Sequence, residues 1–217
     1  MLLIFLMTGF CVRRDFALAD PVKIPLISPK PGMMPRCDED GTDRVDTRNM
    51  KTLSIEVRPG LPRDAAEISL VHRLSWLHTY SGLIPHRPLN EMIDRRNANW
   101  WRKATGGPST LLIIEVAGVI AGYATLGLSR ARALPQEGEV YEIYFRPEYQ
   151  GIGLGRILFG EASSLLTSLG CRGLVVWCLE DCAQADRFFR NAGGRDICEG
   201  MEDFGGKSLK KIGYVWN

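Results

Sequence analysis

The hydrophobic pattern from residue 53 onward switches between two periods. Leu53, Ile55 and Val57 alternate with polar neighbours, which is the two-residue period of a half-buried strand. After Asp64, a suitable helix cap, apolar residues follow at helical spacing to about residue 80. The same criteria predict further helices at about 88–103, 153–169 and 183–191, and strands at 110–116, 119–128, 139–145, 173–179 and 211–216.

The order of these elements predicts the fold class. One strand, two helices, three strands, and then helix, strand, helix and strand follow one another, with no internal repeat. Only two residues, Ala117 and Gly118, separate the strands at 110–116 and 119–128, so this pair is expected to form a hairpin. Strands interleaved with helices in this way indicate an α/β domain whose mixed sheet is covered by helices.

Residues 1–49 have a different character. They contain five of the twelve prolines, show neither period, and carry seven basic and seven acidic side chains. We therefore expect a disordered extension at 1–49, with Met50 as the natural start of translation and residues 50–217 as the domain. The apolar run at residues 1–7 is too short to cross a bilayer and its arginines follow it, although Ala17–Ala19 resembles a cleavage site and leaves export as an alternative.

Composition narrows the class of protein. Of 217 residues, 45% are hydrophobic and 24% charged, which argues against wholesale disorder and against a polytopic membrane protein. The net charge of +2 lacks the basic excess of a nucleic-acid binder. Six cysteines form no C-x-x-C pair, so we expect reduced thiols, no metal site and a cytoplasmic location.

A glycine-rich turn carries the clearest chemical signal. Gly151, Gly153 and Gly155 lie between the strand at 139–145 and the helix that follows. Glycines let the backbone approach a ligand closely, and free N–H groups at a helix start bind phosphate; a tight turn alone is the alternative. The G-x-G-x-G spacing does not fit the dinucleotide fingerprint, and the Lys-Ser/Thr ending of a nucleoside triphosphate loop is missing.

The segment Gln150-Gly151-Ile152-Gly153-Leu154-Gly155 resembles the phosphate motif of the GNAT superfamily of N-acetyltransferases, Arg/Gln-x-x-Gly-x-Gly/Ala. Residues 175–181 and 185–194 resemble the second coenzyme-A segment of that family, and residues 76–85 its acceptor-closing element. The resemblance covers 53–217. It implies a mostly antiparallel mixed sheet that splays between its fourth and fifth strands, with acetyl-CoA as co-substrate and no metal.

The resemblance also implies which residues hold acetyl-CoA. The pantetheine arm would lie along the splayed strand, and the pyrophosphate on the backbone of the glycine turn. The implied binding residues are Ile143, Tyr144, Phe145, Gln150, Gly151, Ile152, Gly153, Leu154, Gly155 and Arg156.

Glu142 is the candidate general base for the attacking amine, with an ordinary salt-bridged carboxylate as the alternative. Tyr144 lies on the same strand face and is expected to line the acceptor site or to donate a proton, with an aromatic that only packs at the edge of the cleft as the alternative. Trp76 and Tyr80 are candidate acceptor-pocket walls, with core packing as the alternative, and core or surface packing is expected for His72.

Two departures from the family pattern concern the acid step. Phe188-Phe189-Arg190 lacks the tyrosine that serves many relatives as general acid, and Cys182 replaces the usual asparagine. The thiolate then leaves unaided, or another group protonates it. The chain is thus expected to acetylate a primary amine of a small molecule or peptide, with no nucleic-acid or membrane partner and with a homodimer as an open alternative. A GNAT fold that binds acyl-CoA as a sensor without turnover is the competing hypothesis.

Overall fold

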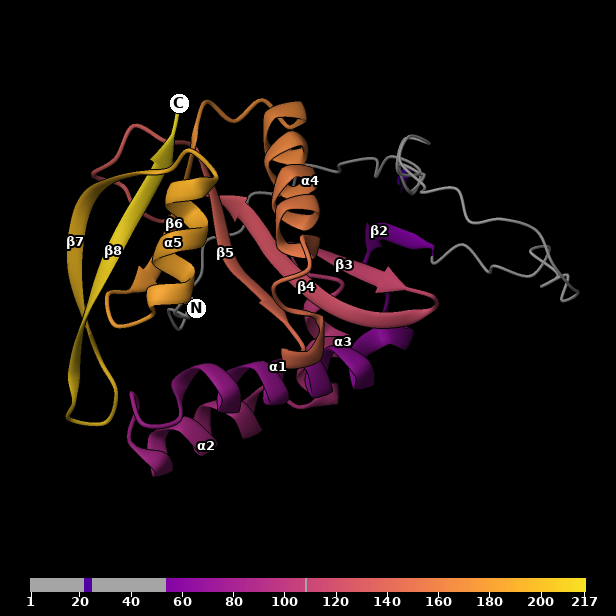
Figure 1. The fold of residues 1–217 in the computed structure, drawn as a ribbon, viewed down its shortest axis with the longest axis horizontal. Coiled ribbons are helices and arrows are strands. Elements are labelled where there is room, and N and C mark those ends of the chain that lie inside the picture. Colours follow the sequence, from indigo (N-terminus) through magenta and orange to yellow (C-terminus); the bar gives the residue numbers. More distant parts are fainter. Residues whose placement is uncertain (1–21, 25–53, 108) are drawn as a thin grey trace, which may run out of the picture.

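The computed structural model describes residues 22–24, 54–107 and 109–217 (Figure 1). Of the expected extension, only Val22–Ile24 lie within these ranges, and their backbone forms strand β1, antiparallel to β2. No strand was predicted at these three residues, because the segment shows neither period. Met50 and the rest of 1–49 lie outside the described residues, so the domain boundary at residue 50 stays a prediction.

The described strands form one mixed sheet in the order β1-β2-β3-β4-β5-β6-β8-β7. All neighbours are antiparallel except β5 and β6, which are parallel, so the predicted fold class is confirmed. After β1, the strands are β2 (Ile55–Pro59), β3 (Thr110–Val116), β4 (Val119–Leu128), β5 (Gly138–Phe145), β6 (Leu174–Leu179), β7 (Arg195–Asp203) and β8 (Ser208–Trp216).

Strand β7 was not predicted from the sequence. Among the described strands it lies at the edge and pairs only with β8, and charged residues stand at five of its nine positions. Such charges protect a sheet edge from pairing with another chain, and they also remove the apolar alternation by which a strand is recognised.

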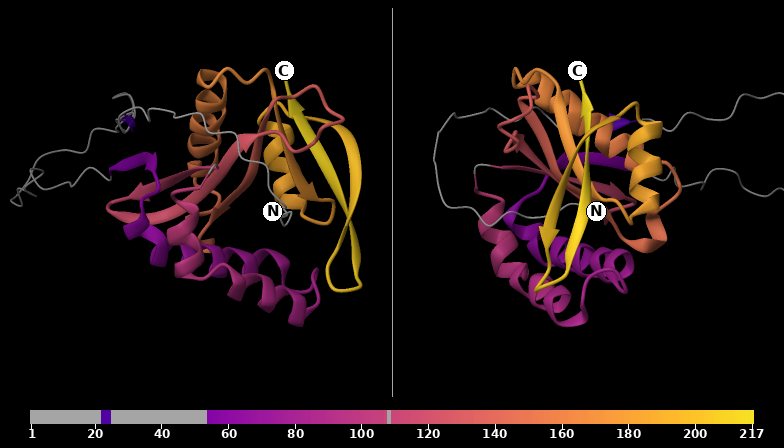
Figure 2. Two further views of the ribbon diagram at one scale, coloured as in Figure 1. Left: turned by 180° about the vertical axis from the view of Figure 1, so that it is seen from behind. Right: turned by 90° about the vertical axis from the view of Figure 1, so that its left-hand side faces the viewer.

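Helices cover both faces of the sheet (Figures 1 and 2). Helices α1 (Ala65–Tyr80), α2 (His86–Arg95) and α3 (Ala98–Ala104) lie on one side, and α4 (Leu154–Ser168) and α5 (Ala183–Asn191) on the other. No helix of the described ranges is long and apolar enough to span a membrane.

The single helix predicted at 88–103 is in fact two helices. Arg96 leaves the helical conformation at ψ +47°, and the Asn97 side chain accepts hydrogen bonds from the backbone N–H groups of Asn99 and Trp100. Asparagine is among the best helix N-caps, so it restarts the chain as α3 in a new direction. The break brings the Arg96 side chain onto the sheet.

The sheet opens between β5 and β6. The two strands pair only where Gly138–Val140 meet Leu174–Val176. Beyond that point β5 remains paired with β4 on its other side, and Trp177–Leu179 of β6 remain paired with β8. Figure 1 shows the two strands diverging, which confirms the predicted splay, since β5 and β6 are the fourth and fifth strands counted from β2.

Candidate active site

The open end of β5 leads into the glycine turn. A short 3-10 helix at Pro147–Tyr149 follows the strand, and α4 begins at Leu154. Gly151 and Gly153 have φ angles of +78° and +92°, a left-handed conformation that favours glycine. A Cβ added at Gly153 would have no atom within 4 Å, so open space lies beside the helix start. No side chain of the described residues caps α4, and its first backbone N–H groups are therefore available to an anion.

The side chain of Gln150 fastens this turn in place. Its Nε2 donates to the Phe145 carbonyl oxygen at 3.1 Å, at the end of the splayed strand. Its Oε1 accepts a hydrogen bond of 3.2 Å from Gln184 on α5, which lies after β6. Gln150 thus ties the turn to the end of β5 and to α5, the helix that follows β6.

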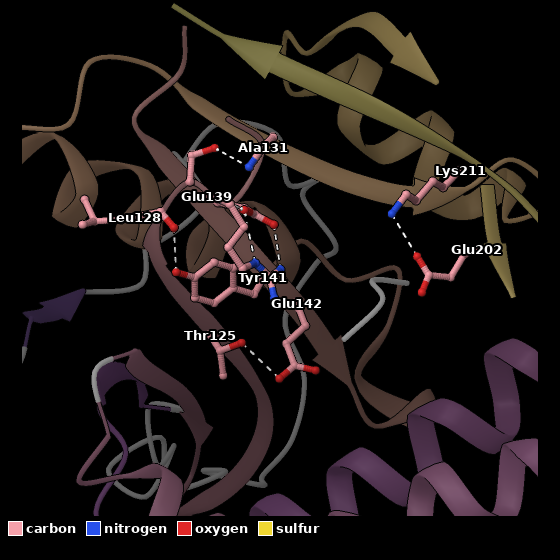
Figure 3. A network of polar contacts seen from close by, with 10 residues as sticks. Thr125, Leu128, Ala131, Glu139, Tyr141, Glu142, Glu202 and Lys211 are labelled. Carbon is pink, nitrogen blue, oxygen red and sulfur yellow. Dashed lines mark hydrogen bonds and ion pairs between the residues drawn. The ribbon is translucent and has the colours of Figure 1, made fainter. Parts of the chain in front are cut away.

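The other face of β5 carries a buried ion pair. Glu142 is 2% exposed, and both of its carboxylate oxygens accept from Nη1 of Arg96 at 2.7 Å. Oε1 also accepts from the Thr125 hydroxyl at 3.0 Å (Figure 3), and the Tyr123 hydroxyl lies 3.4 Å from Oε2. Within the described part of the chain, the carboxylate therefore contacts three side chains, of which Arg96 carries a positive charge.

His72 continues this network away from the ion pair. Its Nδ1 lies 2.8 Å from the Tyr123 hydroxyl, and its Nε2 is sealed from solvent with no hydrogen-bond partner among the described residues. Burial, together with the positive charge of Arg96, lowers the pKa of His72 well below its ordinary 6.5. The imidazole is accordingly neutral in the folded protein at neutral pH.

A neutral buried histidine makes stability depend on pH. Below pH 6.5 the unfolded chain binds a proton at His72 and the folded chain does not, so the free energy of unfolding falls as pH falls. Carboxylates with lowered pKa values, such as Asp64, change the free energy of unfolding only below about pH 5. We expect a loss of about 1.4 kcal/mol between pH 7.5 and 5.5, measured by urea unfolding.

The matched variants isolate the residue responsible. His72→Gln should remove this pH dependence, whereas His78→Gln, on the exposed face of the same helix, should retain it. An unchanged slope in His72→Gln would show that His72 is protonated inside the folded protein.

Aromatic side chains pack around these polar groups. The hydroxyls of Tyr80 and Tyr144 lie 3.0 Å apart, and the Trp76 ring centroid is 5.1 Å from that of Tyr80. Burial, and then the negative charge of Glu142, raise the pKa of Tyr144 well above 10, so this phenol keeps its proton. Trp76 and Tyr80 are buried in this cluster. Their low exposure does not support the prediction that they line an open acceptor pocket, which stays a prediction.

The structure places several of the predicted site residues close together. Glu142 and Tyr144 lie on the same face of β5, as predicted, and this face is packed against Arg96 and Tyr80 rather than against α4. Cys182 is the N-cap residue of α5 and is buried, and burial raises the pKa of its thiol, which disfavours a nucleophilic role. The sequence reading missed Arg96, Tyr123 and Thr125. Only the helix cap at Asn97, one residue after Arg96, offered a signal for one of them.

Comparison with known proteins decides the family. Residues 72–193, more than half of the chain, match the Acetyltransferase (GNAT) family. The chain belongs to the GNAT family. It is accordingly an N-acetyltransferase, and the uncharacterized N-acetyltransferase YuaI of Bacillus subtilis is 27% identical over 162 residues, 75% of this chain and 92% of that protein.

Solved structures agree with this GNAT assignment at the level of the fold. The PaiA N-acetyltransferase of Thermoplasma acidophilum, solved with coenzyme A, has a TM-score of 0.58 at 19% identity, covering 73% of this chain and 98% of that one. The putative acetyltransferase yncA of Salmonella typhimurium, solved with acetyl-CoA, has a TM-score of 0.59 at 22% identity, covering 75% and 92%.

Proposed function

We propose that this GNAT protein transfers the acetyl group of acetyl-CoA to a primary amine of a small molecule or peptide by direct attack. The observation that carries the proposal is the splayed strand β5, which is followed by a short 3-10 helix and then by two left-handed glycines that lead into the start of α4. An extended arm fits along the unpaired strand edge, and a pyrophosphate fits on the helix start, so one ligand of this shape can occupy both.

In this proposal the backbone of Ile143, Tyr144 and Phe145 pairs with the pantetheine arm. The backbone N–H groups of the turn, from Gly151 through Ile152, Gly153 and Leu154 to Gly155, hold the pyrophosphate, and Arg156 adds an exposed positive charge in the first turn of α4. Gln150 holds the turn in position through its bond to the Phe145 carbonyl.

The reaction joins the amine nitrogen to the acetyl carbon and breaks the carbon–sulfur bond, whose electron pair leaves on sulfur. Glu142 is proposed to take the proton that the amine must lose, directly or through water. Tyr144, which keeps its proton because of burial, is proposed to deliver one to the departing thiolate. This assignment supplies an acid where Phe188 and Phe189 lack a phenol.

The experiment that tests the proposal measures CoA release from acetyl-CoA with a panel of amines, together with acetyl-CoA binding by calorimetry. Release that depends on the amine, with an acetylated product of the expected mass, supports the enzyme. Tight binding of acetyl-CoA without release from any amine would favour the non-catalytic sensor instead.

Gly153 gives a direct test of the phosphate site. A valine side chain would fill the open space beside the start of α4 and would strain the left-handed backbone, so Gly153→Val should weaken acetyl-CoA binding by at least about tenfold. Gly170→Val is the matched control, since Gly170 has φ +84° and equally open surroundings, but follows the far end of α4.

Calorimetry on both variants separates strain from lost binding. Equal losses of acetyl-CoA affinity in Gly153→Val and Gly170→Val would assign the effect to general strain. Wild-type affinity in Gly153→Val would place the pyrophosphate elsewhere.

A further inference from the structure

The guanidinium of Arg96 forms side-chain hydrogen bonds through one of its three nitrogens within the described residues. Its hydrogen bonds to Glu142 come from Nη1 alone, and Nε and Nη2 make none within the described ranges. Its side chain is 8% exposed, against 2% for Glu142. Some described side chains have a polar atom that is buried from solvent and has no hydrogen-bond partner, but no Arg96 atom is among them. Nε and Nη2 of Arg96 therefore retain contact with solvent.

The free edge of Arg96 is held rigidly. Its Cζ lies 4.5 Å from the Trp100 ring centroid and 5.4 Å from that of Trp101, so indole rings pack against the guanidinium. The ion pair with Glu142 fixes the opposite edge. Two N–H groups on one side of a planar guanidinium form a fork that matches a carboxylate in a bidentate arrangement.

We propose that the acceptor is a primary amine that carries a carboxylate a few bonds away, as an α-amino acid does. The carboxylate binds the Nε/Nη2 edge of Arg96, and the amino group is directed toward Glu142. This inference rests on the proposed function, because it gives the amine a place beside the proposed base.

Charge complementarity favours this class of acceptor. Arg96 and Glu142 present a positive and a negative group side by side, and a zwitterionic amino acid presents the opposite pair at similar spacing. A dianionic phosphate would be repelled by Glu142 more strongly than a carboxylate. A plain alkylamine would leave the Arg96 fork unused.

Acceptor binding at Arg96 would also affect the base. All close contacts of the Glu142 oxygens involve donors, and Arg96 supplies the shortest of them. A second carboxylate bound to the same guanidinium weakens the electrostatic attraction between Arg96 and Glu142. An acceptor with a carboxylate should therefore have a higher kcat as well as a lower KM.

The test compares three forms of each common amino acid with acetyl-CoA: the acid, its amide and its decarboxylated amine. For leucine these are L-leucine, L-leucinamide and 3-methylbutylamine. The amide is less basic than the acid's amino group and the alkylamine is more basic, so basicity cannot explain a preference for the acid over both. We expect kcat/KM for at least one acid to exceed that of both its partners by about tenfold or more.

Two variants locate the preference. Arg96→Lys keeps a positive charge beside Glu142 but loses the fork, so the preference for the acid should fall about tenfold to a hundredfold. Arg95→Lys changes the exposed neighbouring arginine and should leave the preference unchanged. Thermal unfolding and acetyl-CoA binding of both variants confirm that they are folded.

The outcomes distinguish the two proposals. Turnover of amines with no acid preferred over its amide and alkylamine would overturn the carboxylate site and leave the acetyltransferase intact. Binding of acetyl-CoA without turnover of any amine would overturn the proposed function; calorimetry of the amino acids with the CoA-loaded protein then tests the site alone. Amino-acid binding that Arg96→Lys abolishes would support the site, and no binding would overturn it.

Discussion

Glu142→Gln is expected to lower kcat by about 10²-fold while leaving acetyl-CoA affinity nearly unchanged. The amide has almost the shape of the carboxylate and can still accept from Arg96 and Thr125, but it cannot take a proton from the amine. The phosphate turn lies on residues after β5, away from this side chain. Steady-state kinetics with the preferred amine and calorimetry with acetyl-CoA measure the two effects separately.

The same strand offers a matched control in Glu139. This residue is also 2% exposed and is also paired with an arginine, since Arg130 donates to Glu139 through its backbone and its guanidinium. Glu139 lies in the part of β5 that still pairs with β6, outside the splay. Glu139→Gln should therefore cost comparable stability and leave kcat within about twofold.

The pH profile adds a second readout. Without a base, the residual rate of Glu142→Gln should rise with pH as more of the free amine loses its proton in solution. A variant with the kcat and pH profile of the wild type would assign proton removal to water or another residue. In that case the carboxylate serves to hold Arg96, and Tyr144 becomes the next residue to test.

The regular elements and the phosphate turn could be predicted because their signals are local. Alternation in 53–57 and the glycines at 151, 153 and 155 depend on neighbours in sequence. The edge strand β7 was not predicted because its charged positions remove the apolar alternation of a strand. The break at Arg96 was not predicted because it depends on one residue, the Asn97 cap, within an otherwise helical pattern. The helical pattern on either side of Asn97 predicts one continuous helix.

The polar network of the site could not be predicted for a different reason. Arg96 and Glu142 are 46 positions apart, and His72 and Tyr123 are 51 apart, so neither pair has a sequence period. Their contact follows from the way α1 and the α2–α3 break pack on β4 and β5. Sequence alone identified the carboxylate, but its partner appears only once the helices are placed on the sheet.

Arg96→Met is expected to lower the free energy of unfolding by about 3–5 kcal/mol, because it leaves the buried Glu142 carboxylate without a countercharge. Methionine fills much of the space of the arginine stem, so the loss is chiefly electrostatic. Arg73→Met is the control: Arg73 pairs with Asp94 at 3.1 Å, but the side chains are 51% and 70% exposed, and such pairs contribute at most about 1 kcal/mol. Urea unfolding at pH 7.5 measures both.

The double variant Arg96→Met/Glu142→Gln separates the pair from its surroundings. Removing both charges avoids an uncompensated buried ion, so the double variant should recover about 1–3 kcal/mol relative to Arg96→Met alone. Loss of the Arg96 charge should also raise the pKa of His72, since that charge is one cause of its lowering, and should reduce the pH dependence of stability. A double variant no more stable than Arg96→Met would mean that Arg96 acts through its packing on Trp100 and Trp101 rather than through its charge.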